Sequence, residues 1–218
     1  MAAVDVEAVG EHRWPMALAV LVAMCLTFVV PHGLRIGPSW VTALVEGILL
    51  VALVVGDPGR IDRRSRWLRW LSIALVAVLL LTALSFTVQL IDDLVHGAQE
   101  TESASDLLRA GAAVWISNNI AFALLYWELD GGGAAARAHG TQQLHFGFPQ
   151  QMSPELGWVG WRPRFVDYLY LGFTNATAFS PTDAMPLAPW AKMAMLLQSV
   201  VSLAILSLVI ANAVNLFA

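Results

Sequence analysis

The sequence predicts an all-α integral membrane protein with five transmembrane helices and a re-entrant helix and loop before the last of them. Hydrophobic residues make up 58% of the 218 residues and charged residues only 13%, whereas a soluble domain carries about 25% charged residues. Five segments come near the roughly 20 apolar residues that a bilayer-spanning helix needs. The predicted spans are 14–31, 39–56, 67–91, 107–127 and 189–217. The single cysteine, Cys25, excludes an intrachain disulfide.

The placement of basic residues predicts how the spans are oriented. Arginine and lysine gather in the cytoplasmic loops of membrane proteins. With the N-terminus in the cytoplasm, ten of the twelve basic residues lie inside and only Arg35 and Arg109 lie outside. We therefore expect a multi-pass protein of the plasma membrane with a cytoplasmic N-terminus and an outside C-terminus. The ten inside are Arg13, Arg60, Arg63, Arg64, Arg66, Arg69, Arg137, Arg162, Arg164 and Lys192.

The segment before the last span predicts the re-entrant helix and loop. Loop 128–162 begins with a Gly/Ala linker and ends with Trp158 and Trp161 beside arginines, which is typical of an interfacial anchor. Residues 163–177 have the apolar and aromatic content of a helix that is too short to cross a bilayer. A polar stretch rich in Thr, Ser and Pro follows, up to residue 183. The alternative is a short amphipathic helix on the membrane surface, followed by an ordinary loop.

Polar side chains occur within two of the spans. Glu46 comes about eight residues into its span, or ~12 Å at 1.5 Å per residue, and a carboxylate at that depth is costly. We expect either a neutral acid bonded to a neighbouring helix or an ion pair with Arg35 or His32. Asn118 and Asn119 lie midway along the fourth span, where amide side chains hold helices together more often than they contact ions.

Three further sequence patterns could indicate a modification site, a metal site or a lipid-binding site. The Asn175–Ala–Thr177 triplet matches a glycosylation signal, but its predicted cytoplasmic position makes the match a chance one. His139 and His145 lie in a Gly-rich loop without a cysteine and do not predict a metal site. The arginines of 60–69 suit anionic headgroups of the lipid bilayer, although they also serve as an orientation signal.

From residue 163 the sequence has Asp167, Tyr168 and Tyr170, followed by the threonines Thr174 and Thr177. A second group of residues follows further on, namely Asp183, Pro186, Pro189, Trp190, Ala191 and Lys192. This pattern resembles the pore region of the two-helix potassium-channel superfamily. The first three residues match its opening, the two threonines match those of its pore helix, and the second group matches the segment after the filter. The chain as a whole resembles a family of uncharacterised bacterial multi-pass membrane proteins of unknown function that share this channel-like ending.

The filter itself departs from the potassium-channel pattern. Between Thr177 and Asp183 the chain reads AFSPT, where the channel family has two glycines around a tyrosine. Such a filter lines a narrow column with backbone carbonyls, and its glycines take positive φ without steric cost. We expect Phe179 and Ser180 to resist those angles and Pro181 to fix φ at about −65°. The resemblance thus implies a degenerate filter without potassium selectivity.

The resemblance divides the chain into an N-terminal three-helix membrane part at 1–105 and a channel-like module at 106–218. Within the module, 163–177 is the expected pore helix, 177–183 the degenerate filter and 189–217 the inner helix. The expected constriction residues are Thr174, Thr177, Phe179, Ser180, Thr182 and Asp183. One face of the inner helix would line a pore or, alternatively, form a packing stripe between helices; it consists of Gln198, Ser202, Ile205, Val209 and Asn212.

Two functions are open from the sequence. The first is a homo-oligomeric pore, a tetramer by the resemblance, that forms a weakly selective cation pathway. The second is a non-conducting accessory or scaffold subunit that retains the channel-like fold. No cluster of nucleophile, base or metal ligands predicts an enzyme, and no cofactor or nucleic-acid partner is expected.

Overall fold

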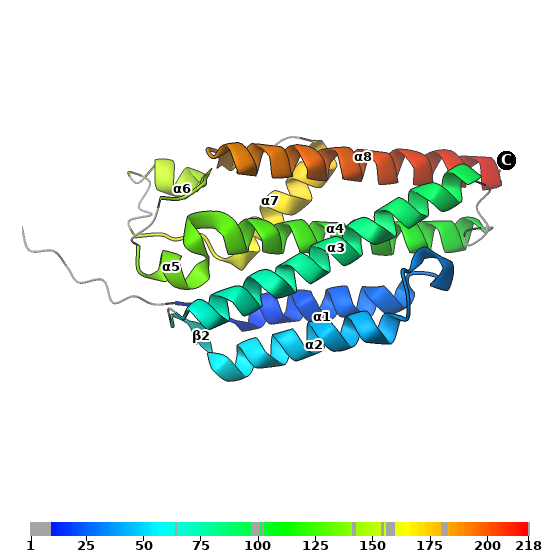
Figure 1. Ribbon diagram of the computed structural model, residues 1–218. Coiled ribbons are helices and arrows are strands. Elements are labelled where there is room, and N and C mark those ends of the chain that lie inside the picture. The colour runs from blue at the N-terminus through cyan, green and yellow to red at the C-terminus, as the bar shows by residue number, and fades with distance from the viewer. Residues whose placement is uncertain are drawn as a thin grey trace, which may run out of the picture.

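The computed structural model is built almost entirely of helices (Figure 1). It describes residues 10–63, 65–96, 101, 103–140, 143–153, 155, 160–179 and 183–217. The helices are α1 (Trp14–Val29), α2 (Ser39–Gly56), α3 (Arg66–His96), α4 (Ala104–Leu129), α5 (Ala134–Ala138), α6 (Pro149–Met152), α7 (Phe165–Ala178) and α8 (Pro189–Phe217). The remaining elements are the 3-10 turns η1 (His32–Leu34) and η2 (Asp130–Gly132) and the strands β1 (Glu11–His12), β2 (Arg60–Ile61), β3 (Phe146–Gly147) and β4 (Met185–Pro186).

Four helices in the described part of the chain, α2, α3, α4 and α8, are long and apolar enough to cross a membrane. The helix α1 is also apolar, but its 16 residues fall short of the usual length of a span. The predicted all-α class and membrane class are thus confirmed at this level. The number of five spans stays a prediction.

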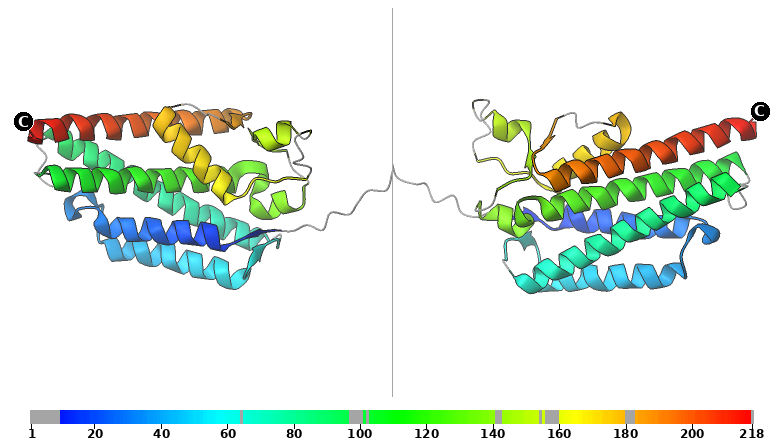
Figure 2. Two further views of the ribbon diagram at one scale, coloured as in Figure 1. Left: turned by 180° about the vertical axis from the view of Figure 1, so that it is seen from behind. Right: turned by 45° about the horizontal axis from the view of Figure 1, so that its top comes forward.

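The helix α4 lies in the middle of the bundle. Figures 1 and 2 show α1 and α2 on one side of it and α7 and α8 on the other, with α3 crossing it obliquely. One hydrophobic cluster joins Phe122 of α4 to Val20 of α1, and a second joins Val114 of α4 to Ile205 of α8. The core therefore runs across residue 105, the predicted boundary between two parts, and that division stays a prediction.

A glycine sets the close approach of α4 and α8. A methyl group placed on Gly111 would lie 2.7 Å from a methyl carbon of Val209, closer than van der Waals contact allows. Small residues at such positions let membrane helices pack backbone to backbone. The Val209 side chain accordingly rests on the bare backbone of α4.

Two short antiparallel ladders lie at the end of the bundle where α1, α3 and α8 begin. In the first, Glu11 of β1 is opposite Ile61 of β2, and in the second, Phe146 of β3 is opposite Pro186 of β4. The segment predicted as loop 128–162 contributes η2, α5, α6 and β3 to this end. These elements hold the start of α7.

Candidate functional site

The candidate site is the module of α4, α7 and α8. The left view of Figure 2 shows α7 crossing obliquely from the end that carries α5 and α6 to a point part-way along α8. Its first turn is capped, because the Arg164 amide donates to the Asp167 carboxylate over 2.7 Å. Tyr168 and Leu171 on its inner face are buried in the main core.

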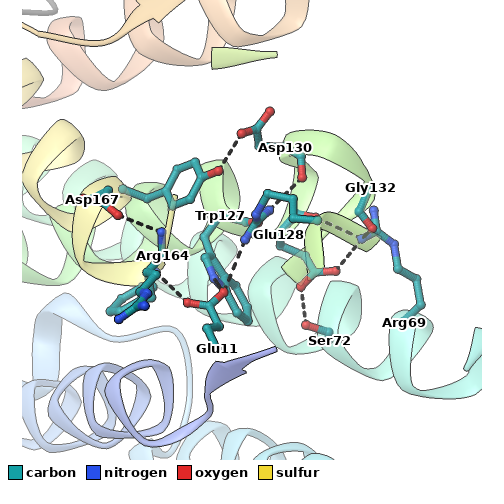
Figure 3. Close-up of polar contacts among 12 residues, drawn as sticks. Glu11, Arg69, Ser72, Trp127, Glu128, Asp130, Gly132, Arg164 and Asp167 are labelled. Atoms are coloured by element: carbon teal, nitrogen blue, oxygen red, sulfur yellow. Dashed lines mark hydrogen bonds and ion pairs between the residues drawn. The ribbon is translucent and has the colours of Figure 1, made fainter. Parts of the chain in front are cut away.

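A buried carboxylate, that of Glu11, anchors the start of α7 (Figure 3). It accepts the Phe165 amide over 2.8 Å and the Trp127 indole N–H over 2.5 Å, and it lies 3.5 Å from an Arg137 guanidinium nitrogen. Burial raises the pKa of the Glu11 carboxyl, and the positive charge of Arg137 opposes that rise. Strand β1 thus reaches across the bundle end to bind α4 and α7 together.

Asp130, just after α4, forms a second anchor. Its carboxylate accepts the Tyr168 hydroxyl over 2.5 Å and the His145 amide over 2.5 Å, and all its surface is buried. Arg137 donates to the carbonyls of Trp127 and Asp130 at 2.6 and 2.7 Å. The guanidinium also lies over the Tyr168 ring, 5.0 Å from its centroid, a favourable position for a cation.

A third set of charges lies beside these two, at the junction of α3 and α4 (Figure 3). The Glu128 carboxylate accepts the Ser72 hydroxyl over 2.5 Å and is 3.2 Å from Arg69. Arg69 also donates to the Gly132 carbonyl. These contacts fix the end of α4 to α3. The Glu11 and Asp130 anchors described above fix α7 to α4.

The far end of α7 is held by an amide side chain of α8. The Gln198 oxygen accepts the Tyr126 hydroxyl over 2.7 Å and the Asn175 side-chain nitrogen over 2.8 Å, while its nitrogen donates to the Gly172 carbonyl over 2.9 Å. Asn175 also donates to the Met195 carbonyl over 3.0 Å. Gln198 has no exposed surface. All three helices of the module therefore meet at this residue.

The helix α7 ends on the surface of the chain. Thr177 is exposed, and its hydroxyl donates to the Phe173 carbonyl over 3.0 Å. Phe179 is 44% exposed and adopts φ 55°, in the left-handed region. The sequence led us to expect that Phe179 would resist such an angle; a left-handed conformation costs a residue with a Cβ about 1–2 kcal/mol. Asp183 is exposed, whereas Ser180 and Thr182 lie outside the described residues.

The structure places most of the predicted inner-helix face inside the chain. Gln198 and Ser202 have no exposed surface, and Val209 rests against Gly111. Asn212 is half-buried and donates to the Leu208 carbonyl of its own helix over 3.0 Å. These contacts are those of a packing stripe. A lining role would require α8 to turn about its axis and stays a prediction.

The side chains of the other predicted polar residues form no hydrogen bond to α7 among the described residues. Asn118 donates to the Thr87 hydroxyl over 2.7 Å and so joins α4 to α3, whereas Asn119 donates to the Trp115 carbonyl of its own helix. Glu46 is fully buried, and neither of its oxygens has a hydrogen-bond partner among the described residues. The ion pair that we considered with Arg35 is not formed, since that guanidinium donates to the Val30 carbonyl.

Sequence reasoning missed the anchors that position α7. For Arg137, in a Gly-rich loop, the sequence predicts only a role as an orientation signal. For Asn175 it shows only a chance match to a glycosylation signal. Tyr126 and Glu11 were not singled out. The signal that could have found Glu11 and Asp130 is an acidic side chain directly beside an apolar helix, because such a carboxylate needs donors close by.

Metal ligation has no candidate in the described part of the chain, where no three His, Cys, Asp or Glu side chains gather. His145 instead packs its ring against Trp190, with the ring centroids 5.4 Å apart. Comparisons of this chain with protein-family models, with curated proteins and with solved structures found no match.

Proposed function

We propose that the chain is a subunit of a channel-like, homo-oligomeric membrane pore without a potassium filter, forming a weakly selective cation pathway. The observation that supports this is the position of the α7 end. Gln198, to which it is bonded, lies nine residues after Pro189, where α8 begins. At 1.5 Å per residue this is ~13 Å along α8. On this proposal α7 is a re-entrant helix, and the chain crosses the bilayer five times.

The exposed end of α7 is the reason to expect more than one copy. Non-helical backbone at membrane depth is tolerated only where protein or a water-filled cavity covers it. Thr177 and Phe179 are exposed on the single chain, so a second copy or water must meet them. The helix α8 also exposes apolar side chains, including Leu203 and Ile210, which suit contact between copies as well as contact with lipid.

The chemistry of this end favours cations over anions. The last four carbonyls of a helix lack intrahelical partners, and the C-terminus of a helix carries a partial negative charge. The hydroxyl protons of Thr174 and Thr177 are donated to carbonyls of their own helix, which leaves oxygen lone pairs as acceptors. Asp183 adds an exposed carboxylate five residues beyond Ala178, the last residue of α7. A ring of Phe179 side chains would form a hydrophobic constriction.

Two measurements test the pore. The first is the oligomeric mass of the purified protein in lipid nanodiscs, for which we expect a tetramer. The second is flux of sodium, potassium and chloride into liposomes. We expect Phe179→Ala to raise cation flux and Asp183→Asn to lower it several-fold. Asp92→Asn is the matched control, because Asp92 is also exposed but lies near the other end of the bundle. A stable monomer would overturn the oligomeric pore.

The alternative is a non-conducting accessory or scaffold subunit that keeps the same fold. The burial of Gln198 and Ser202 against the rest of the chain favours it, since these side chains give no polar lining to a passage. The flux measurement separates the two functions. A tetramer that passes no ion, in the native form or with Phe179→Ala, would favour the accessory subunit.

A further inference from the structure

The carboxyl group of Glu46, on α2, is a buried ionisable group whose packing in the α1–α4 bundle gives it no hydrogen-bond partner among the described residues. Its side chain has no exposed surface, and both its oxygens lack a hydrogen-bond partner among the described residues. The hydroxyl of Ser117, on α4, also lacks a partner there. A buried polar group without a partner costs about 1–3 kcal/mol. Two such groups that line one cavity form a site for a small hydrogen-bonding ligand.

A small cavity lies between these two groups. Its volume is about 10 Å³, and the residues that line it include four with a carboxyl or hydroxyl group, Glu46, Ser117, Thr27 and Thr82. A space of about 10–15 Å³ on this measure holds one water molecule, provided that polar partners surround it. The remaining lining is apolar and comes from Ala23, Leu79, Ala83, Phe86 and Ala121. No second ionisable group faces Glu46 among the described residues that line the cavity.

A larger cavity of about 200 Å³ lies next to this one, at the bundle end that carries η1. The two cavities share Thr27, Thr82 and Phe86 in their linings. Hydroxyls also line the larger one, from Ser39, Thr42 and Ser85. Its single charged lining residue in the described chain is Arg35, whose guanidinium is occupied by the Val30 and Phe28 carbonyls.

We propose that Glu46 is a proton-binding site, bridged by one water molecule to Ser117 and reached by protons through the hydroxyl-lined cavity from the η1 end. A carboxylate there would be an unpaired charge at membrane depth, whereas a carboxylic acid can donate its proton to the water, which in turn bonds to the Ser117 hydroxyl. The site is independent of the proposed pore, because it needs neither a second copy nor ion flux.

The test is modification by dicyclohexylcarbodiimide, an apolar reagent that reacts with a protonated carboxyl in a membrane, followed by mass spectrometry of peptides. We expect the peptide with Glu46 to be labelled and the labelling to fall as the pH rises. Glu128 is the internal control: it is also buried, but is paired with Ser72 and Arg69, so its peptide should stay unlabelled. Filling the cavity with Ser85→Phe should slow the labelling of Glu46 several-fold.

Infrared difference spectroscopy gives a second measurement that does not depend on the reagent. The carbonyl stretching band of a protonated carboxyl should be present in the native protein, shift in heavy water and be absent in Glu46→Gln. That variant keeps the size of the side chain and should fold. Absence of both the band and the label in the folded protein would overturn the proposal. Protection of Glu46 by sodium at constant pH would also overturn it, by assigning the site to a metal cation.

Discussion

The side-chain nitrogen of Asn175 donates to the side-chain oxygen of Gln198 over 2.8 Å, and this bond joins the last turns of α7 to α8. Tyr126 of α4 donates to the same oxygen. A single side-chain atom therefore fixes three helices, two of which are far longer than the third. The position of α7 depends on this atom at one end and on the buried anchors at the other.

Removing the Asn175 amide should destabilise the module. In Asn175→Ala the Gln198 oxygen loses one of its two donors and the Met195 carbonyl loses its side-chain donor, and we expect a cost of about 1–2 kcal/mol in unfolding free energy. Asn212→Ala is the matched control, because that amide bonds only within its own helix, and should cost less than about 0.5 kcal/mol. Denaturant titration in detergent measures both. Equal losses would contradict the role assigned to Asn175.

Glu11 and Arg137 should be energetically coupled. Arg137→Gln leaves the buried Glu11 carboxylate without its positive partner and should cost about 3–5 kcal/mol. The double variant with Glu11→Gln removes both charges and should cost less than the sum of the single variants, by about 1–3 kcal/mol. A double-mutant cycle on unfolding free energies measures the coupling. Additive losses would show that the 3.5 Å contact contributes nothing.

The stability contributed by Glu11 should depend on pH. Because burial raises its pKa above the ordinary 4.5, the folded chain binds more protons than the unfolded chain just above that value. The stability that the neutral acid contributes is then fully present below pH 4.5. It is lost as the pH rises through the pKa of the carboxyl in the folded state. The unfolding free energy of the native protein, minus that of Glu11→Gln, should fall across this interval. A difference that grows with pH would show that pairing with Arg137 outweighs burial.

Enlarging Gly111 should separate α4 from α8. In Gly111→Ala the new methyl group would meet Val209 at 2.7 Å, and overpacking of this kind costs about 1–3 kcal/mol. Val209→Ala removes the opposing methyl groups, so the double variant should recover part of that loss. Thermal unfolding of the single and double variants measures the recovery. If the double variant is no more stable than Gly111→Ala, the strain in Gly111→Ala comes from a contact other than that with Val209.

The sequence predicted the long helices well because an apolar run of this length has few backbone structures other than a helix open to it in a membrane. The helix α3 nevertheless continues to His96, beyond the predicted end at 91, because the polar residues Asp92 and Asp93 can extend a helix that has left the apolar layer. The short helix at 163–177 was also found in nearly the predicted place, as α7. Such local features follow from composition and helical length.

The contacts of the module could not be predicted in the same way. A helical stripe such as that of Gln198 shows which residues share a face, but the sequence does not say whether that face meets the same chain or another copy. Arg137 bonds to Trp127 and Asp130 nearby but also to Glu11, far away in the sequence. The backbone angle of Phe179 differs from the expectation because Phe179 is the C-cap of α7, a position where helices commonly end in the left-handed conformation.

The two-sided anchoring of α7 has a consequence for how the protein is made. Its partners Glu11 and Asp130 are synthesised before it, whereas Gln198 is synthesised after it. The ribosome must therefore release much of α8 before α7 can take its final position, and until then its polar end has no counterpart in the nascent chain. A chain terminated shortly before Gln198 should retain α4 in the membrane and leave the segment of α7 open to protease, a state that quality control can recognise.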